Sequence, residues 1–314
     1  LTYLNPWGIH LVKTFLKIWK NSQLKRLFLV RFPGIHKTGQ PLTEDPQKAY
    51  AKDKKFCLRR DATIPPPAQG QIVGGVYCMA IFRGSLYSRC LDMRTDITAM
   101  LPSDSEPAPP QGIIFLLHGL SDNSHCWEER TMLPVFAEEH NVAVIMPEVQ
   151  RSWYADLTNG PQYFSYVSTE LPKLAEKLFG LRFPRECTAV MGLSMGGYGA
   201  LKCGLTFPER FGICCGFSSA CDVWTDRESY QHTQLRREMD ALLSDGSVTR
   251  EKADLFVLAE KAMEKGVIPR IYTTCGKQDR LYDMNIRMKD HLARLGYGNV
   301  YEEWEGTHNA RGRL

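Results

Sequence analysis

The chain has 314 residues, of which 43% are hydrophobic and 24% are charged, and its formal net charge at pH 7 is +4. These values are typical of a globular protein and exclude a fibrous or wholly disordered chain, and the length suits one large α/β domain plus an extension. Residues 1–78 contain 13 Lys and Arg against 4 Asp and Glu, whereas the remaining residues contain 26 against 31. We therefore interpret the chain as two parts rather than one folding unit.

The basic composition of residues 1–78 predicts an N-terminal extension that is disordered or not native to the protein. Its stretch 11–31 is basic and amphipathic, a pattern that also suits binding to an anionic membrane or a partner. Lysines interrupt each apolar run of this stretch, which excludes a membrane span or a signal-peptide core there, at positions 13, 17, 20 and 25. A further hypothesis is that Met79 is the natural start, because codons for Gly74-Gly75 can form a ribosome-binding sequence just upstream.

The ten cysteines show no C-x-x-C spacing and no pairing with histidine that suggests zinc. Several lie inside apolar runs, among them Cys187, Cys214 and Cys275, which favours free buried thiols in a reducing cytoplasm. A disulfide framework is not expected in a domain long enough to bury a full core. We therefore expect a cytoplasmic protein without a metal, a cofactor or a nucleic-acid partner.

From Met79 onward the chain predicts an α/β domain that extends to residue 314. Segments 79–82 and 92–100 predict antiparallel strands, and 113–117 is a continuous apolar run, as in a strand buried on both faces of a mostly parallel sheet. His118-Gly119-Leu120 follows at the carboxyl end of that strand, where open α/β sheets bind ligands. We expect the Leu120 amide to help hold an oxyanion and His118 to shape the loop, with His118 as proton acceptor the alternative.

The next segments predict a helix over 127–140, a strand over 142–146 and a long polar and aromatic loop over 147–161. Residues 163–179 predict a helix in which Pro172 marks a kink or a later start. Aromatic side chains in and after the loop are candidates for lining a substrate pocket. The alternative is that they only pack in the hydrophobic core. These candidates are Trp153, Tyr154 and Tyr163.

The most informative stretch is Gly192-Leu193-Ser194-Met195-Gly196, a G-x-S-x-G pattern between an apolar run at 187–191 and a helical segment at 197–207. The pattern needs glycines because the strand-to-helix turn is so tight that a Cβ would collide with neighbouring backbone. Such a turn exposes the Ser194 hydroxyl and points the Met195 amide at the group under attack. We interpret this stretch as a nucleophile elbow, with a Gly-rich structural turn as the alternative.

A carboxylate and an imidazole follow the serine in the chain order that α/β-hydrolases use. Asp279 comes just after a predicted strand at 268–275, and His308 comes just after the last predicted strand at 300–304. Asp279 would accept the hydrogen of the His308 ring and fix its tautomer. Asp222 and Asp283 are the alternatives for the acid.

The other segments after the elbow predict a strand at 211–217, inserted helices over 222–266 and a helix at 281–295. The insertion is charged and has only a weak apolar pattern. We expect its helices to lie over the strand ends, where a lid over the site would sit.

Between about Met79 and His308 the chain resembles the putative-esterase family of α/β-hydrolases. This family includes bacterial tributyrin esterases and, more distantly, S-formylglutathione hydrolases, feruloyl esterases and mycolyltransferases. The matching motifs are at 117–121, 153–154, 192–199, 275–282 and 306–308. The resemblance implies an α/β-hydrolase fold with helices on both faces of a mostly parallel sheet and a small helical insertion. It also implies Ser194, Asp279 and His308 as a triad, the amides of Leu120 and Met195 as an oxyanion hole, and a C-terminal helix that this chain lacks.

Together these features predict a serine carboxylesterase that hydrolyses short-chain acyl esters, its small-molecule partners, through an acyl-serine intermediate and without a cofactor. S-formylglutathione hydrolase, or an acetyl or feruloyl esterase acting on carbohydrate-linked esters, is the alternative. Tyr198 stands where the family's thioesterases tend to carry His, which counts against the first of these. The non-enzyme alternative is an inactive hydrolase domain used for binding. The sequence leaves open whether the chain forms a homo-oligomer.

Overall fold

The computed structural model of the chain describes residues 79–103, 109–224 and 233–308. The expectations for residues 1–78 and for a missing C-terminal helix lie outside these ranges. Within them, no helix combines the length and the apolar character that crossing a bilayer requires.

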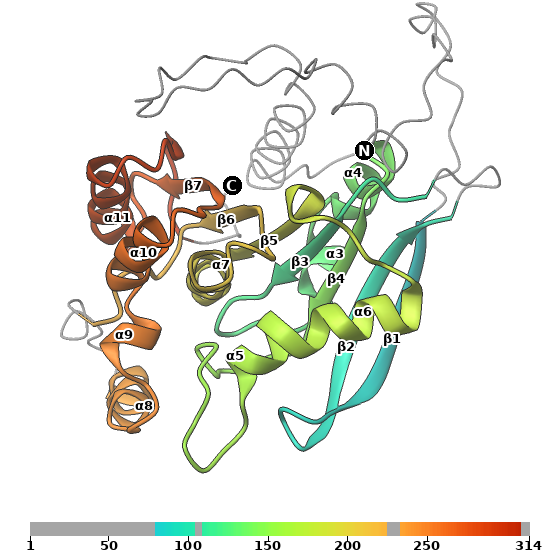
Figure 1. The fold of residues 1–314 in the computed structure, drawn as a ribbon, viewed down its shortest axis with the longest axis horizontal. Coiled ribbons are helices and arrows are strands. Elements are labelled where there is room, and N and C mark those ends of the chain that lie inside the picture. Colours follow the sequence, from blue (N-terminus) through green and yellow to red (C-terminus); the bar gives the residue numbers. More distant parts are fainter. Residues whose placement is uncertain (1–78, 104–108, 225–232, 309–314) are drawn as a thin grey trace, which may run out of the picture. The chain divides into compact units, whose positions relative to one another are not determined.

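Eight strands of the described residues form one sheet in the order β1-β2-β4-β3-β5-β6-β7-β8 (Figure 1). β2 pairs antiparallel with both β1 and β4, and all other neighbours pair parallel. The predicted antiparallel start and mostly parallel centre are therefore confirmed. The strands are β1 Met79–Ser88, β2 Met93–Pro102, β3 Ile113–Leu117, β4 Ala143–Pro147, β5 Thr188–Leu193, β6 Ile213–Phe217, β7 Arg270–Gly276 and β8 Val300–Trp304.

Strand β3 shows why the central strands are continuous apolar runs. Ile113, Phe115 and Leu117 pack into one hydrophobic cluster, whereas Ile114 and Leu116 pack into a second cluster on the opposite face. Helices cover both faces. The second cluster includes residues of α3 Cys126–Arg130 and α4 Leu133–Glu139; the first includes residues of α5 Tyr163–Ser165, η2 Tyr166–Glu170, α6 Leu171–Phe179, α7 Met195–Thr206, α10 Leu255–Glu264 and α11 Tyr282–Arg294.

The predicted helical insertion lies between β6 and β7. It contains α8 Thr233–Leu243, α9 Arg250–Ala253 and α10, and α10 packs against α7. Arg151 of the long loop before α5 forms an ion pair with Glu238 of α8, with an N–O distance of 2.6 Å. The Ser247 hydroxyl donates to the carbonyl of Asp156 at 2.5 Å. The insertion is therefore fastened to the loop that carries the predicted aromatic residues.

Two prolines account for the differences from the predicted helices. The segment 127–140 divides into α3 and α4 because Pro134, in the first turn of α4, has no N–H for the carbonyl of Arg130. Pro172 lies in the first turn of α6, directly after the π-helical turn η2 and the short 163–165 helix. The Ser168 carbonyl, which Pro172 leaves without its helical partner, accepts a hydrogen bond from the Arg210 guanidinium instead.

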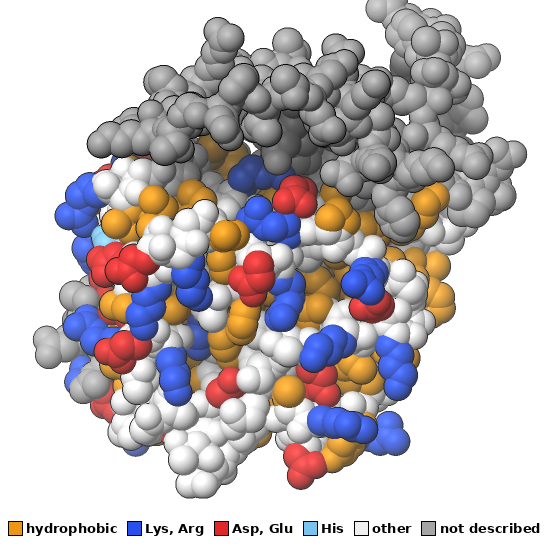
Figure 2. All heavy atoms as spheres, viewed as in Figure 1, with side chains coloured by type: hydrophobic (Ala, Val, Ile, Leu, Met, Phe, Trp, Pro, Cys, Tyr) orange, Lys and Arg blue, Asp and Glu red, His pale blue; other side chains and the backbone are white. Residues whose placement is uncertain are grey.

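The face of the domain shown in Figure 2 carries Lys and Arg side chains interspersed with Asp and Glu side chains. Opposite charges of the described residues also form ion pairs, for example Arg236 with Asp240 at 3.0 Å on α8. Charge on the visible part of this face is therefore mixed in sign.

Candidate active site

Ser194 occupies a strained turn between β5 and α7. Its φ of +60° and ψ of −116° lie in a region that non-glycine residues rarely adopt, which costs about 1–3 kcal/mol. The backbone is held by three hydrogen bonds. The Ser194 N–H donates to the carbonyl of Phe217 at 2.9 Å, and the Ser194 carbonyl accepts from Tyr198 and Ala220 at 3.0 and 3.1 Å. The surrounding structure thus fixes the serine in the geometry of a nucleophile elbow.

The glycines of the elbow have no room for a side chain. A Cβ on Gly192 would lie 2.3 Å from the carbonyl oxygen of Gly196, and a Cβ on Gly196 would lie 2.3 Å from that of Leu117. Both contacts are with backbone, which cannot rotate out of the way. The spacing of the G-x-S-x-G pattern is therefore dictated by the close approach of β3, β5 and α7.

A first prediction follows for Gly196→Ala. Because the added methyl group would overlap the carbonyls of Leu117 and His118, we expect a loss of about 3 kcal/mol in the free energy of unfolding. Gly246→Ala is the matched control, since no atom lies within 4 Å of the Cβ position there, and it should change stability by less than about 0.5 kcal/mol. Urea denaturation measures both, and equal effects would contradict the prediction.

His308 and Asp279 complete a hydrogen-bonded line with the serine. The Ser194 hydroxyl lies 3.1 Å from His308 Nε2, and His308 Nδ1 lies 3.0 Å from each carboxylate oxygen of Asp279. The Asp279 side chain is fully buried, and that of His308 is 20% exposed. Burial opposes the ionisation of Asp279, but the hydrogen bond and charge of His308 and the Leu281 amide hold the pKa of the carboxyl below its ordinary value.

The loops that carry Asp279 and His308 are joined by backbone hydrogen bonds. Lys277 N–H donates to the carbonyl of Trp304, and Gln278 N–H donates to that of Gly306, each at 2.9 Å. The Gln278 side-chain oxygen accepts from Gly306 N–H at 2.5 Å. This clamp by Gln278 was not evident from the sequence. It fixes the carboxylate and the imidazole relative to each other.

The alternative proton acceptor and acids are engaged elsewhere. His118 is 1% exposed; its Nε2 accepts from Val149 N–H at 3.0 Å, and its Nδ1 lies 2.8 Å from the carbonyl of Gly119. Asp222 forms an ion pair with Arg287 at 3.0 Å, and Asp283 is exposed on the first turn of α11. The structure thus places His118 in the loop scaffold and brings Asp279, rather than Asp222 or Asp283, to the His308 ring.

The two amides expected to bind an oxyanion border the serine. Met195 is the first residue of α7, and amides in the first turn of a helix have no intrahelical acceptor. The loop of Leu120 lies against the elbow, since a Cβ on Gly119 would be 3.7 Å from the Ser194 Cβ and 3.5 Å from the carbonyl of Leu193. The Gly119 turn that precedes Leu120 and the first peptide of α7 therefore both border Ser194.

The three aromatic candidates are buried, with 5%, 0% and 6% exposure for Trp153, Tyr154 and Tyr163. The Tyr154 hydroxyl donates to the carbonyl of His118 at 3.0 Å. The Trp153 ring packs edge-on to Tyr198, with 6.2 Å between centroids. Tyr154 thus supports the loop that carries Leu120, a role that aromatic composition alone did not indicate.

Metal ligation and the thiols Cys126 and Cys203 offer no alternative chemistry among the described residues. No group of three His, Cys, Asp or Glu side chains in these ranges is arranged to hold a metal ion. The cysteines described are free, and most are buried. Burial raises the pKa of the Cys126 and Cys203 thiols to about 12, so both are protonated at neutral pH.

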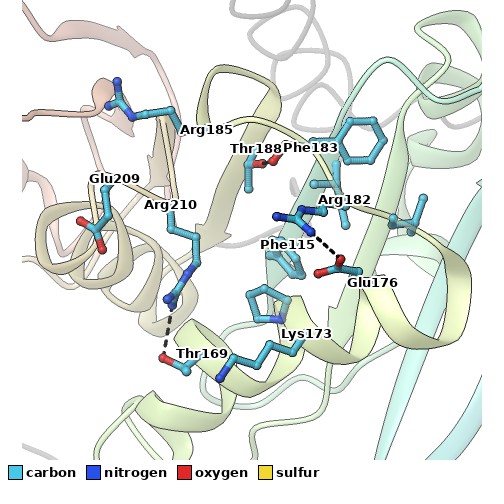
Figure 3. Close-up of a pocket in the computed structure, with 13 residues that line it drawn as sticks. Phe115, Thr169, Lys173, Glu176, Arg182, Phe183, Arg185, Thr188, Glu209 and Arg210 are labelled. Atoms are coloured by element: carbon cyan, nitrogen blue, oxygen red, sulfur yellow. Dashed lines mark hydrogen bonds and ion pairs between the residues drawn. The ribbon is translucent and has the colours of Figure 1, made fainter. Parts of the chain in front are cut away.

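A cavity of about 360 Å³ lies at the amino ends of β3 and β5, whereas Ser194 follows the carboxyl end of β5 (Figure 3). Two interactions hold side chains at its rim. Arg182 pairs with Glu176 at 3.2 Å, and Arg210 donates to the Thr169 hydroxyl at 3.2 Å. Because Ile113 and Thr188 begin β3 and β5 whereas Ser194 follows the end of β5, the side chains of this cavity lie away from the chemistry at Ser194.

Comparison with known proteins gives consistent matches. Residues 88–310 match a family described as "Putative esterase". An acetyl esterase from Caldicellulosiruptor saccharolyticus is 32% identical over 248 residues, which cover 74% of this chain and 92% of that protein. An S-formylglutathione hydrolase from Paracoccus denitrificans is 26% identical, covering 55% of this chain and 66% of that protein. The crystal structure of an S-formylglutathione hydrolase from Staphylococcus aureus matches with a TM-score of 0.66 and 30% identity, covering 74% of this chain and 93% of that one.

Proposed function

Because the chain belongs to this esterase family and has its α/β-hydrolase fold, we propose that it is a serine carboxylesterase in which Ser194 is the nucleophile. The observation that carries the proposal is the 3.1 Å contact between the Ser194 hydroxyl and His308 Nε2, with Asp279 on the other ring nitrogen. A serine, an imidazole and a buried carboxylate in this order form the arrangement that activates an alcohol for acyl transfer.

In the proposed mechanism, His308 accepts the Ser194 proton as the oxygen attacks the ester carbonyl. The amides of Met195 and Leu120 hold the oxyanion, and His308 then protonates the leaving alcohol. Asp279 keeps the ring in the tautomer that leaves Nε2 free and stabilises the imidazolium. Water activated by the same histidine releases the acid from the acyl-serine. No metal or cofactor takes part in these steps.

Short acyl esters are the proposed substrates, an inference supported by the acetyl esterase relative at 32% identity. The alternative is a thioester such as S-formylglutathione, supported by the Staphylococcus aureus structure at 30% identity. Tyr198 does not decide between them by contact, since its hydroxyl donates to the carbonyl of Ala253 at 2.7 Å and its side chain is 3% exposed. The free thiols support a reducing compartment, and we propose the cytoplasm.

Substrate profiling tests the proposal. We expect p-nitrophenyl acetate and butyrate to give a kcat/KM at least about tenfold above the octanoate ester, because one extra methylene in a hydrophobic pocket changes selectivity by about 1–3 kcal/mol. We also expect both esters to exceed S-formylglutathione at least about tenfold. A tenfold preference for S-formylglutathione would favour the thioesterase instead. No turnover of any ester or thioester by the folded protein would favour a domain that only binds.

A further inference from the structure

Lys202 is a lysine inside the protein core, two turns along α7 from Ser194. Its residue exposure is 4%, and its ammonium donates to the carbonyl of Tyr154 at 2.7 Å. The ammonium also lies 4.3 Å from the centre of the Phe164 ring. Among the described residues it forms no ion pair with a carboxylate, so a carbonyl dipole and an aromatic face are its main polar contacts.

This placement is unfavourable for stability. Burial lowers the pKa of the Lys202 ammonium to about 8, and the charge of Asp156 only partly opposes that shift. Removing a charged group from water is costly, and the single hydrogen bond to the Tyr154 carbonyl offsets that cost only in part. Lys202 therefore requires an explanation other than packing.

The carbonyl that Lys202 holds belongs to a strained corner. Trp153 and Tyr154 are consecutive non-glycine residues with φ of +52° and +49°. Two such residues in succession persist only where the surroundings fix them. The Tyr154 ring lies flat on α7 at Gly199, where a Cβ would be 2.5 Å from the ring. Lys202 and Gly199 thus hold the corner against the same helix that carries Ser194 at its start.

From this corner the contacts lead to the elbow. The Tyr154 hydroxyl donates to the His118 carbonyl at 3.0 Å. This carbonyl precedes Gly119 and Leu120, and the turn at Gly119 lies beside Ser194. The His118 ring is fixed by Val149 N–H in the strand-to-loop junction after β4. A shift of Tyr154 would therefore move the carbonyl of His118 and the Leu120 amide together.

We propose that Lys202 is a positioning residue for the oxyanion-binding loop, acting through the Tyr154 carbonyl and hydroxyl on the His118 peptide. The inference rests on the proposed esterase function. In this role Lys202 holds the strained corner at Trp153 and Tyr154 in place, so that the Leu120 amide faces the oxyanion that forms at Ser194. The ammonium itself touches neither substrate nor serine.

The test compares Lys202→Met, Tyr154→Phe and the double variant, with Lys177→Met on the exposed side of α6 as the matched control. With p-nitrophenyl acetate we expect Lys202→Met to lower kcat about tenfold and to change KM less than twofold, because a displaced amide weakens transition-state binding. Tyr154→Phe should give a similar loss. The double variant should be no more than about twofold below the worse single variant, since both act through one chain of contacts. Lys177→Met should match wild type.

Thermal stability provides the readout that separates positioning from packing. We expect the Tm of Lys202→Met at pH 7 to stay close to that of wild type, because relief of the ammonium's desolvation offsets the lost hydrogen bond to the Tyr154 carbonyl, although kcat is lower. The folded protein binds fewer protons at Lys202 than the unfolded chain between about pH 8 and pH 10. Wild type should therefore gain stability relative to Lys202→Met as the pH rises through this range.

Three outcomes would overturn the inference: wild-type kcat in Lys202→Met, a loss of kcat matched by an equal loss of folded protein, or independent effects in the double variant. If Lys202→Met does not fold, Tyr154→Phe decides, and wild-type kcat in that variant overturns the inference. Labelling of wild type by a fluorophosphonate is measured first. Absence of wild-type labelling refutes the esterase proposal, whereas labelled wild type with fully active variants refutes only the role of Lys202.

Discussion

Ser194→Ala should lower kcat for p-nitrophenyl acetate by at least about 10⁴-fold, because the variant lacks the hydroxyl that forms the acyl intermediate. The Ser194 hydroxyl is the atom that contacts His308 Nε2 at 3.1 Å. Some rate enhancement over water should persist in the variant, since the amides of Met195 and Leu120 remain in place to hold the oxyanion. Steady-state kinetics with active-site titration of the wild type measure the effect.

Ser194→Gly is a matched variant that separates catalysis from folding. Glycine adopts the φ of +60° found at this position without steric cost, so this variant should be about 1 kcal/mol more stable than wild type. It should be as inactive as Ser194→Ala. A Ser194 variant that is folded and retains more than a few per cent of wild-type kcat would refute the assignment of the nucleophile.

The second large effect is expected for Asp279→Asn. The amide cannot fix the ring as the carboxylate does, so His308 loses the tautomer and orientation that leave Nε2 free to accept the proton. We expect kcat to fall by about 10³- to 10⁴-fold with little change in KM. Asp222→Asn is the control, because that carboxylate pairs with Arg287, and its kcat should remain within about threefold of wild type. Comparable losses in the two variants would contradict the assignment.

The pH dependence of stability gives an independent check on Asp279. Its pKa in the folded protein lies below the ordinary value, so the ionised carboxylate stabilises the fold above about pH 4. This stabilisation is lost as the pH falls through the lower folded-state pKa. Asp279→Asn should therefore be less stable than wild type at pH 7, and the difference in Tm should shrink towards pH 3. A difference that grows on acidification would contradict the shift.

The features that the sequence predicted well are local. The apolar run of β3 indicates a strand that is buried on both faces, and the glycines around Ser194 indicate a turn in which no Cβ fits. Each pattern is short and has one physical cause. Strand β8 was predicted at its observed bounds, 300–304, and His308 follows it, so position after a strand was enough to place the imidazole.

The features that were missed depend on distant partners. The single helix predicted over 127–140 was wrong, because Pro134 divides it into α3 and α4. The Ser168 carbonyl that Pro172 frees accepts from Arg210, 42 residues away. Lys202 lies in the helical segment predicted over 197–207, and no feature of the sequence marks it as buried. Its burial follows from the packing of the 147–161 loop on α7, which no local pattern encodes.

The most direct test of the central claim is mass spectrometry of the protein after reaction with a fluorophosphonate. We expect one adduct per chain, located by peptide mapping on Ser194, and no adduct in Ser194→Ala. Labelling should also slow by at least about a hundredfold in His308→Ala, because the hydroxyl then lacks its base. An adduct on another residue, or none on folded wild type, would show that the serine at the elbow is not the nucleophile.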